Sequence, residues 1–335
     1  MAILSKNDYI ISPVYYIKSF AKINLSLTVT GKNNNGYHLL KSLFSYIDLY
    51  DLITIQQNSN NCPSFKASGQ FSSSLKNDFD SIDNNLIIKV MQKMHEKYNI
   101  PTNFDICLDK RIPVASGMGG GSSNAAAMIR FLNDFLGLEL SNDKLIEMAL
   151  SIGADVPFFL QNSMAICEGV GDIVTPIDCK DELFGVIIYC GLKASTGSIF
   201  GALSKKYNQP KLDYSAKTID YQNIIDIIKN NGNDLTNPAI LFSQSISRVL
   251  SFIDNTNLSV VSGMSGAGPT CFSICKSQSD AEKLVFNLRS EFGNFFTKKV
   301  KFLSKINFET ILPSLQPNYE CINFSQYADK YNIKC

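Results

Sequence analysis

A glycine-rich segment between a predicted strand and a predicted helix carries the strongest chemical signal in the sequence. Residues 117–121, the first glycine loop, contain four glycines and precede Ser122 and Ser123. Glycines let a backbone approach a phosphate, and the following helix N-terminus adds N–H donors and positive potential. A plain strand-to-helix turn with Ser122 or Ser123 as N-cap is the simpler interpretation. Such a turn needs one or two glycines, and each extra one costs roughly 0.5 to 1 kcal/mol, so the segment predicts a phosphate-binding loop.

Two common phosphate motifs do not fit this loop. Gly121 is followed by Ser122-Ser123-Asn124, so the Gly-Lys-Ser/Thr ending of a Walker A loop is missing. The third glycine of a dinucleotide fingerprint is replaced by Ser122, and no acidic residue ends a strand about 20 residues later. The loop therefore predicts phosphate binding of another kind.

A lysine and an aspartate could act beside such a loop. Lys22 lies on the polar face of an alternating segment, where an exposed strand lysine is the plain alternative. Asp155 follows Gly153-Ala154 and enters the apolar run Val156-Pro157-Phe158-Phe159, so we expect it to be partly buried and to need a charged partner. Phosphoryl transfer to a hydroxyl needs both groups: one that orients or deprotonates the hydroxyl, and a cation for the transferring phosphoryl group.

Two further features could belong to the same site. Residues 263–268, the second glycine loop, could form a hairpin turn but contain more glycine than a hairpin requires. His38 follows Gly36-Tyr37 and could recognise a ligand, whereas we expect His95, on the polar face of a helix, to face solvent. Each is weak evidence alone.

The hydrophobic pattern predicts the elements that position these residues. Alternation over 19–31 predicts a half-buried strand with Lys22 and Asn24 on one face, and a second strand is expected over 43–55. Residues 56–82, rich in Asn and Ser, predict irregular or hairpin-like structure. Further along, the patterns predict helices and strands in these segments: a helix from 83–85 to before Pro101, a strand at 104–108, a helix ending at Gly137, a helix capped by Ser141, strand-turn-strand over 164–177, a strand at 186–189, a helical region over 197–256, a strand at 270–274 and a helix over 280–292.

Composition excludes several classes of protein. The 335 residues carry 31 Lys plus Arg against 30 Asp plus Glu, a formal net charge of +1, so no long-range field favours nucleic acid or a membrane surface. Only four arginines are present, Arg111, Arg130, Arg248 and Arg289, so backbone N–H groups and lysines are the expected anion ligands. We expect neither nucleic acid nor a membrane as partner.

The cysteines and the N-terminus indicate a reducing compartment. Nine scattered cysteines are an odd number and form no disulfide framework, and two histidines make a structural zinc site improbable. The N-terminal stretch lacks an apolar signal region, because Ser12-Pro13 interrupts Ile10-Ile11. No run approaches the ~18 apolar residues of a membrane span. A cytoplasmic protein is therefore expected.

Five motifs in order resemble those of the GHMP kinases, small-molecule kinases that use ATP. The resemblance extends from about residue 19 to residue 275, and it is carried by these segments: Ala21-Lys22-Ile23-Asn24-Leu25 with Gly36-Tyr37-His38, Pro113 to Ala126, Gly153-Ala154-Asp155-Val156-Pro157, Glu168-Gly169-Val170-Gly171, and Gly263-Met264-Ser265-Gly266-Ala267-Gly268. The resemblance implies an α/β (α+β) fold of two domains with the active site in the cleft between them. The expected division is an N-terminal extension (1–18), an ATP-binding and catalytic domain (19–182), and a C-terminal domain with a tail (183–335).

The resemblance also implies roles for individual residues. Asp155 matches the catalytic aspartate and Lys22 its lysine partner, and Asn24, Tyr37 and His38 match the substrate side. His38 would read the edge of a cytosine and Tyr37 would stack on its face, with Phe200 as the opposite ring. The expected ATP-binding residues are the following: Asn85, Leu86 and Lys110 around the adenosine, and Pro113, Val114, Ala115, Ser116, Gly117, Met118, Gly119, Gly120, Gly121, Ser122 and Ser123 around the phosphates.

Gly-Tyr-His and Gly-Ala-Asp-Val-Pro separate one member of the family from homoserine and mevalonate kinases. They imply ATP-dependent phosphorylation of the 2-hydroxyl of a cytidine-diphosphate sugar alcohol, in the non-mevalonate route to isoprenoid precursors. Another small-molecule kinase of the homoserine or mevalonate type, and a catalytically silent binding member, stay open as alternatives. ATP and Mg²⁺ are the expected cofactors. The metal ligands are unknown, with Ser123 a candidate and Glu168 a weaker one, and the chain is expected as a monomer or homodimer.

Overall fold

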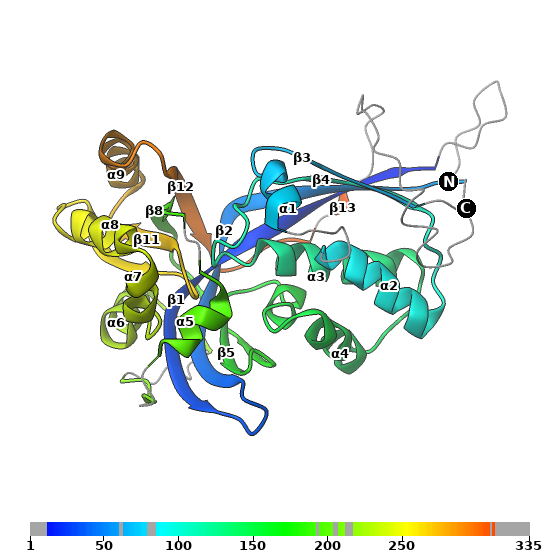
Figure 1. Ribbon diagram of the computed structural model, residues 1–335, viewed down its shortest axis with the longest axis horizontal. Helices are drawn as coiled ribbons and strands as arrows, with labels where there is room; N and C mark the ends of the chain where they lie inside the picture. Colours follow the sequence, from blue (N-terminus) through cyan, green and yellow to red (C-terminus); the bar gives the residue numbers. More distant parts are fainter. Residues whose placement is uncertain are drawn as a thin grey trace.

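The computed structural model describes residues 12–59, 63–78, 85–191, 194–203, 207–211, 217–308 and 310–311 (Figure 1). Its strands are β1 (Val14–Lys32), β2 (His38–Gln57), β3 (Ser64–Ser68), β4 (Phe104–Asp109), β5 (Ala165–Gly169), β6 (Ile173–Pro176), β7 (Asp178–Cys179), β8 (Leu183–Tyr189), β9 (Thr218–Ile219), β10 (Ser259–Met264), β11 (Thr270–Cys275), β12 (Phe296–Leu303) and β13 (Thr310–Ile311). Its helices are α1 (Ser72–Asp78), α2 (Leu86–Tyr98), α3 (Gly120–Phe135), α4 (Asn142–Ile152), the 3-10 helix η2 (Pro157–Leu160), α5 (Thr196–Gly201), α6 (Tyr221–Asn231), α7 (Thr236–Phe242), α8 (Gln244–Asp254) and α9 (Gln278–Glu291).

One large sheet runs through the described part of the chain. Its main path follows the order β10-β11-β8-β12-β2-β1-β13, and β3, β4, β5 and β6 join it through β2 and each other. β1 and β2 have 19 and 20 residues and pair antiparallel along their length. In Figure 1 these two strands extend from the group formed by α2, α3 and α4 to the group formed by α5 to α9. The β1–β2 hairpin therefore belongs to both groups.

The prediction that β1 is half-buried is wrong, because both faces of its central part are buried. Every residue from Ala21 to Val29 is at most 3% exposed. The apolar face packs in one hydrophobic cluster with isoleucines of α6. The polar face, with Lys22 and Asn24, lies against the two glycine loops: a Cβ on Gly119 would be 3.1 Å from Lys22 Cγ, and Ser265 Oγ lies 3.4 Å from Asn24 Oδ1. A polar strand face buried in this way indicates a site.

Three hydrophobic clusters form the core. The first joins β2, β4, α2, α3 and α4. The second joins β1, β2, β5 and the first glycine loop to β8, β11, β12 and α6. The third joins the end of β1 to β8, β11, α7, α8 and α9. β1 contributes Ile17 to the first, Ile23 to the second, and Leu27 and Val29 to the third. The division at residue 182 stays a prediction, and in the structure β1 packs on both sides of it. Residues 14–18, which the sequence assigned to an extension, form the start of β1 and pair with residues 52–56.

The segment 56–82 is more regular than its composition predicts. Gln57 still belongs to β2, residues 64–68 form β3, parallel to β4, and residues 72–78 form α1. The expectation of irregular structure is wrong for these residues because pairing with β4 supplies hydrogen bonds that a low-hydrophobicity segment could not organise alone. Residues 60–62 and 79–84 lie outside the described residues.

Most other elements confirm the sequence patterns. Asn85 is the N-cap of α2, and its side chain accepts a hydrogen bond from the Ile87 N–H, while residues 83 and 84 lie outside the described residues. Strand-turn-strand over 164–177 appears as β5 and β6, paired antiparallel. The second glycine loop joins the antiparallel strands β10 and β11, so the hairpin interpretation is confirmed. Within the described ranges, no helix is long and apolar enough to cross a membrane.

Candidate active site

A buried lysine and a partly exposed aspartate form an ion pair at the centre of the site. Lys22 Nζ lies 3.3 Å from Asp155 Oδ2, and their side chains are 3% and 41% exposed. Lys22 also donates a 2.5 Å hydrogen bond to Asn24 Oδ1 and lies 4.6 Å from the centre of the Phe44 ring. Irregularities in the β1–β2 register lie on either side of the pair Lys22 and Asn24. Such bulges re-aim side chains, and here both polar side chains meet on one face.

Asp155 lies in a short turn that anchors its backbone and leaves its carboxylate accessible. α4 ends at Ile152, the Val156 N–H donates to the Gly153 carbonyl, and η2 follows at once. Arg130 on α3 donates to the carbonyl of Phe159 in η2. Burial lowers the pKa of Arg130 to about 10, so the guanidinium stays charged near neutral pH. The turn is therefore fixed between α3 and α4, while the carboxylate can meet a substrate hydroxyl.

The first glycine loop contacts the same lysine. The Lys22 N–H donates to the Met118 carbonyl over 3.0 Å. Gly119 has φ +68°, and a Cβ there would lie 2.7 Å from Phe159 Cζ and 3.1 Å from Lys22 Cγ. Gly119 is also the N-cap of α3, which rules out the alternative of a plain turn capped by Ser122 or Ser123. The close approach of the loop to Lys22 and Phe159 excludes any side chain at this point.

The start of α3 has the properties of a phosphate site. The helix begins at Gly120, no side chain caps it, and its first turn contains no acidic residue. Its first N–H groups therefore lack intrahelical partners, and the 16-residue helix directs positive potential at the loop. Ser122 is half-buried, while Ser123 is buried and accepts a hydrogen bond from the Ser19 hydroxyl. Pro113, Val114, Ala115 and Ser116 form the approach to the loop, where Ala115 has φ +51°.

Gly119 offers a direct test of this geometry. If the first glycine loop holds the phosphates of ATP, as the resemblance implies, Gly119→Ala should raise KM for ATP roughly tenfold, because the methyl group would displace the loop from Phe159 and Lys22 and the left-handed backbone disfavours alanine. Gly137→Ala is the matched control: Gly137 has φ +59° and nothing within 4 Å of its would-be Cβ. That variant should lose stability without a change in KM. Steady-state kinetics and thermal melts measure both, and equal KM changes in the two variants would contradict the close-contact argument.

The second glycine loop supports the first. Ser265 Oγ accepts from the Asn24 N–H and donates to the Gly117 carbonyl over 2.9 Å. A Cβ on Gly117 would lie 2.5 Å from the Ser265 carbonyl oxygen and 2.9 Å from that of Gly268. Sequence reasoning noticed the excess of glycine in this hairpin, and the structure gives the reason: the loop packs directly on the first glycine loop.

Lys110 lies beneath the first glycine loop in a buried ion pair. Its Nζ is 2.5 Å from Asp51 Oδ2, and the side chains are 4% and 0% exposed. Burial lowers the pKa of Lys110, although Asp51 opposes the shift. Asp51 also accepts from the Arg111 and Ile112 N–H groups, and a Cβ on Gly120 would be 2.9 Å from Lys110 Nζ. Asp51 thus fixes the connection between β4 and the first glycine loop. Sequence reasoning missed this residue, although a carboxylate inside an apolar strand could have indicated it.

The other residues expected around the adenosine lie beside the loop. Leu86, at the start of α2, would be 3.5 Å from a Cβ on Gly121. Asn85 is occupied by capping the same helix. The structure thus brings Leu86 and the start of α2 to the first glycine loop, and the adenosine-binding role of Asn85, Leu86 and Lys110 stays a prediction.

An aromatic wall lies beyond Asn24, formed by His38, Phe200 and Tyr207. The His38 and Phe200 rings are stacked with centroids 4.9 Å apart, and Tyr207 meets His38 edge-on at 6.3 Å. Tyr37 is 67% exposed. Asn24, expected on the substrate side, accepts from Lys22 and donates to the Ser42 hydroxyl, so both ends of its amide are bonded within the protein. Sequence reasoning missed Tyr207.

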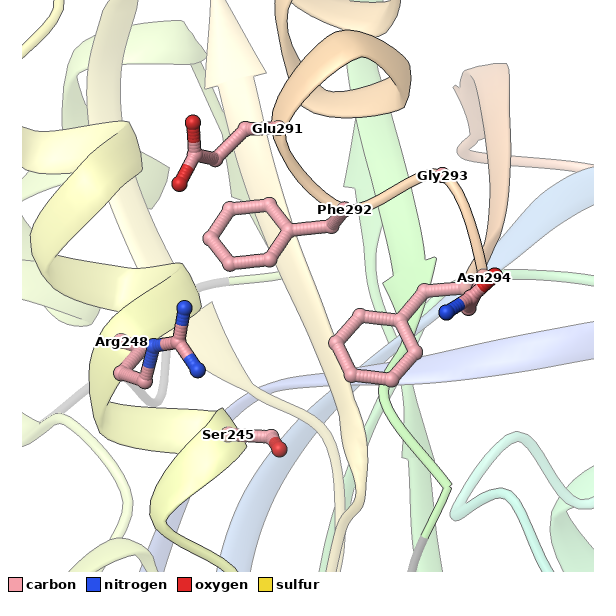
Figure 2. Close-up of a pocket in the computed structure, with 7 residues that line it drawn as sticks. Ser245, Arg248, Glu291, Phe292, Gly293 and Asn294 are labelled. Carbon is pink, nitrogen blue, oxygen red and sulfur yellow. The ribbon is translucent and has the colours of Figure 1, made fainter.

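A surface hollow of about 200 Å³ lies elsewhere, between α8 and α9. Figure 2 shows the residues that line it: Ser245, Arg248, Glu291 and residues 292–295. The Arg248 guanidinium lies 5.9 Å from the centre of the Phe292 ring. None of the expected site residues lines this hollow, so the chemistry is located by the ion pair and the two loops and not by cavity size.

Known proteins share these features. The model of the GHMP kinases N terminal domain matches residues 85–163, and the model of the GHMP kinases C terminal matches residues 214–294. With the curated relatives described next, these matches show that the chain belongs to the GHMP kinase family. The expected GHMP kinase fold is thereby confirmed.

The relatives are more specific than the family. The 4-diphosphocytidyl-2-C-methyl-D-erythritol kinase of Clostridium botulinum (strain Kyoto / Type A2) is 33% identical over 282 residues, which cover 83% of this chain and 97% of the relative. The kinase of the same name from Alkaliphilus oremlandii (strain OhILAs) is 35% identical over 277 residues, 82% of this chain and 92% of the relative. Within the family, the chain therefore falls among the 4-diphosphocytidyl-2-C-methyl-D-erythritol kinases.

Solved structures show the same fold. A crystal structure of 4-(cytidine 5'-diphospho)-2C-methyl-D-erythritol kinase superposes with a TM-score of 0.68 at 23% identity, covering 86% of this chain and 99% of that one. Homoserine kinase from Cytophaga hutchinsonii ATCC 33406 has a TM-score of 0.60 at 16% identity, with 93% and 100% coverage.

Proposed function

We propose that the chain transfers the γ-phosphoryl group of ATP to the 2-hydroxyl of 4-diphosphocytidyl-2-C-methyl-D-erythritol. The observation that carries the proposal is the ion pair of Lys22 and Asp155 directly beside the first glycine loop. The names of the relatives supply the substrate. A hydroxyl acceptor, a phosphoryl donor and a positioned charge pair are what this reaction class requires.

Each group of the site has a step in this reaction. The Asp155 carboxylate, 41% exposed, orients the 2-hydroxyl and accepts its proton as the oxygen attacks. Buried Lys22 holds that carboxylate and places positive charge where the transferring phosphoryl group passes. The N–H groups of the first glycine loop and of the start of α3 hold the phosphates of ATP in line.

Magnesium is the cofactor that ATP requires here, and the residues fit a loosely held ion. Within the described ranges, no group of three or more His, Cys, Asp or Glu side chains could hold a metal. Mg²⁺ is usually bound through substrate phosphates, waters and one or two protein oxygens. The Ser123 hydroxyl, at the start of α3, suits one such contact. Glu168 pairs with Lys41 at 3.4 Å and is the weaker candidate. Mg²⁺, when bound, would neutralise negative charge on the ATP phosphates.

The aromatic wall would hold the cytosine. Because His38 stacks on one face of Phe200, His38 would turn away to free that face, and the base would insert between Phe200 and Tyr37 with its amine at the His38 ring nitrogen. Tyr37, at 67% exposure, has surface to bury against a base. A Tyr37→Ala protein should therefore lose affinity for the cytidylated substrate and keep its affinity for ATP.

A coupled ADP-release assay tests the proposal. The purified chain with Mg-ATP should release ADP only when the cytidylated substrate is added, and not with mevalonate or homoserine. Turnover with either of those acceptors, and none with the cytidylated one, would replace the proposal by the alternative kinase. Binding of ATP without turnover on any acceptor would identify a silent member of the fold.

His38 gives the proposal a pH dependence. Burial, together with the charge of Lys32, lowers the pKa of His38 below 6.5, so the ring is neutral at pH 7 and can accept a hydrogen bond from the cytosine amine. KM for the cytidylated substrate should be constant at neutral and higher pH and should rise as the pH falls through the lowered pKa of His38, because protonation removes the acceptor. His38→Gln should remove this rise. An equal rise in the variant would assign the titration to another group.

Compartment and assembly complete the proposal. Among the described residues, Cys167, Cys179, Cys190, Cys271 and Cys275 are thiols outside any disulfide, as a reducing cytoplasm would keep them. The substrate is a small molecule. The chain is predicted to be a monomer or a homodimer, and sedimentation equilibrium can distinguish the two.

A further inference from the structure

Two neighbouring side chains connect β1 to both halves of the site. Asn233 and Asp234 lie between α6 and α7, and they run beside β1, with a parallel bridge between Leu27 and Asn233. The Leu27 N–H donates to the Gly232 carbonyl, and the Asp234 N–H donates to the Leu27 carbonyl, each over 2.9 Å. The backbone of the dipeptide is therefore fixed on β1, a few residues from Lys22 and Asn24.

The Asn233 side chain points at the second glycine loop. Its Nδ2 donates to the carbonyls of Met264 and Gly266 over 2.6 and 2.9 Å, and its Oδ1 accepts from the Leu235 N–H. All of its hydrogen-bonding groups are used. The loop that it holds contacts the Gly117 carbonyl through Ser265, so Asn233 acts on the phosphate side of the site.

The Asp234 side chain points to the aromatic wall. Its Oδ2 accepts from the Val29 N–H over 2.8 Å, and its Oδ1 accepts from Asn208 Nδ2 over 2.9 Å. The Asn208 N–H in turn donates to the Val29 carbonyl. Asn208 follows Tyr207, whose ring meets His38, so Asp234 ties the segment that carries Tyr207 to β1.

We propose that Asn233 and Asp234 are positioning residues with separate targets: Asn233 sets the second glycine loop for ATP, and Asp234 sets the aromatic wall for the cytidylated substrate. The inference rests on the proposed function. It predicts that adjacent, isosteric substitutions alter different kinetic constants, which a purely structural role of this segment would not do.

The test uses two single variants, in which Asp234 is replaced by asparagine or Asn233 by aspartate. Asp234→Asn should raise KM for the cytidylated substrate about fivefold and leave KM for ATP within twofold, because one of its two acceptors becomes a donor. Asn233→Asp should lower kcat and raise KM for ATP, each about tenfold, with KM for the cytidylated substrate within threefold, because it loses the donors to both loop carbonyls.

A reversed pair checks the Asp234 contact itself. In Asn208→Asp/Asp234→Asn, the new amide can accept from Val29 and donate to the new carboxylate, so KM for the cytidylated substrate should return to within twofold of wild type. Asn208 and Asp234 line a hollow of about 440 Å³, so the changed groups meet no steric barrier. Asp226→Asn on α6, where the carboxylate bonds only Gln222 among the contacts described, is the matched charge control and should behave as wild type.

The outcomes separate the two levels of inference. A wild-type chain that does not turn over the cytidylated substrate removes the proposed function. Suppose instead that the wild-type chain turns over the cytidylated substrate. The positioning roles alone are then overturned if Asp234→Asn and Asn233→Asp each change both KM values in parallel, or if the reversed pair stays impaired. If a single variant melts at too low a temperature for kinetics, the reversed pair and the Tyr207→Ala variant test the proposal. Tyr207→Ala should raise KM for the cytidylated substrate and leave KM for ATP unchanged. An unchanged KM for the cytidylated substrate would contradict the role assigned to the aromatic wall.

Discussion

Asp155→Asn should lower kcat by about 10³-fold and leave the affinity for ATP unchanged. The amide keeps the size of the carboxylate but can neither accept the hydroxyl proton nor balance the buried charge of Lys22, which lies 3.3 Å away. Positioned proton transfer contributes typically 10² to 10⁴-fold. Stopped-flow or steady-state kinetics with the cytidylated substrate, and calorimetric titration of ATP, measure the two quantities.

The partner of this pair supplies the control. Lys22→Met should lower kcat to a similar extent, and the Lys22→Met/Asp155→Asn double variant should be little worse than either single one, because the two groups act as a unit. Fully additive losses would show that the lysine and the aspartate serve separate steps. Normal turnover of Asp155→Asn would remove the assignment of the base altogether.

Asp51→Asn should destabilise the protein by about 3 to 5 kcal/mol, because it leaves Lys110 charged and unpaired in the interior. The side chain is fully buried and also accepts from the Arg111 and Ile112 N–H groups. The connection from β4 to the first glycine loop should loosen, so KM for ATP should rise as well. Urea denaturation gives the free energy of unfolding, and steady-state kinetics give KM.

Two variants bound this interpretation. Asp109→Asn breaks the neighbouring pair with Arg111, whose side chains are 31% and 42% exposed, and it should cost less than about 1 kcal/mol. Lys110→Met in the Asp51→Asn background removes the stranded charge and should recover part of the lost stability. An Asp51→Asn protein as stable as Asp109→Asn would show that the buried pair contributes little.

Local patterns predicted the elements and the motif positions well. The strand around Lys22, the N-cap Asn85 and the hairpin around the second glycine loop all depend on residues near one another in the chain. The ion pair with Asp155 was also expected from a carboxylate that enters an apolar run. In each case the chemistry of a short segment was sufficient.

Contacts between distant segments were not predictable in this way. The alternating pattern predicted that β1 is half-buried. In the structure its polar face is covered by loops about 95 and 240 positions further along the chain. Asp51 pairs with Lys110 across 59 positions, and Asn233 reaches Met264 across 31. A single sequence shows which of these side chains are polar, but not which carbonyl or ammonium group satisfies them. The N-cap of α3 is likewise set by a long-range contact, because close packing at Gly119 outweighs the usual preference for serine.

The sharing of β1 among all three core clusters also determines how the molecule unfolds. Leu27 and Val29 lie in the core of the C-terminal half, while Ile17 of the same strand lies in the core of the N-terminal half, and β12 pairs with β2. Neither half can open without exposing part of the other, so the two halves form one cooperative unit. Binding of a ligand to either half should therefore protect the other half against proteolysis as well.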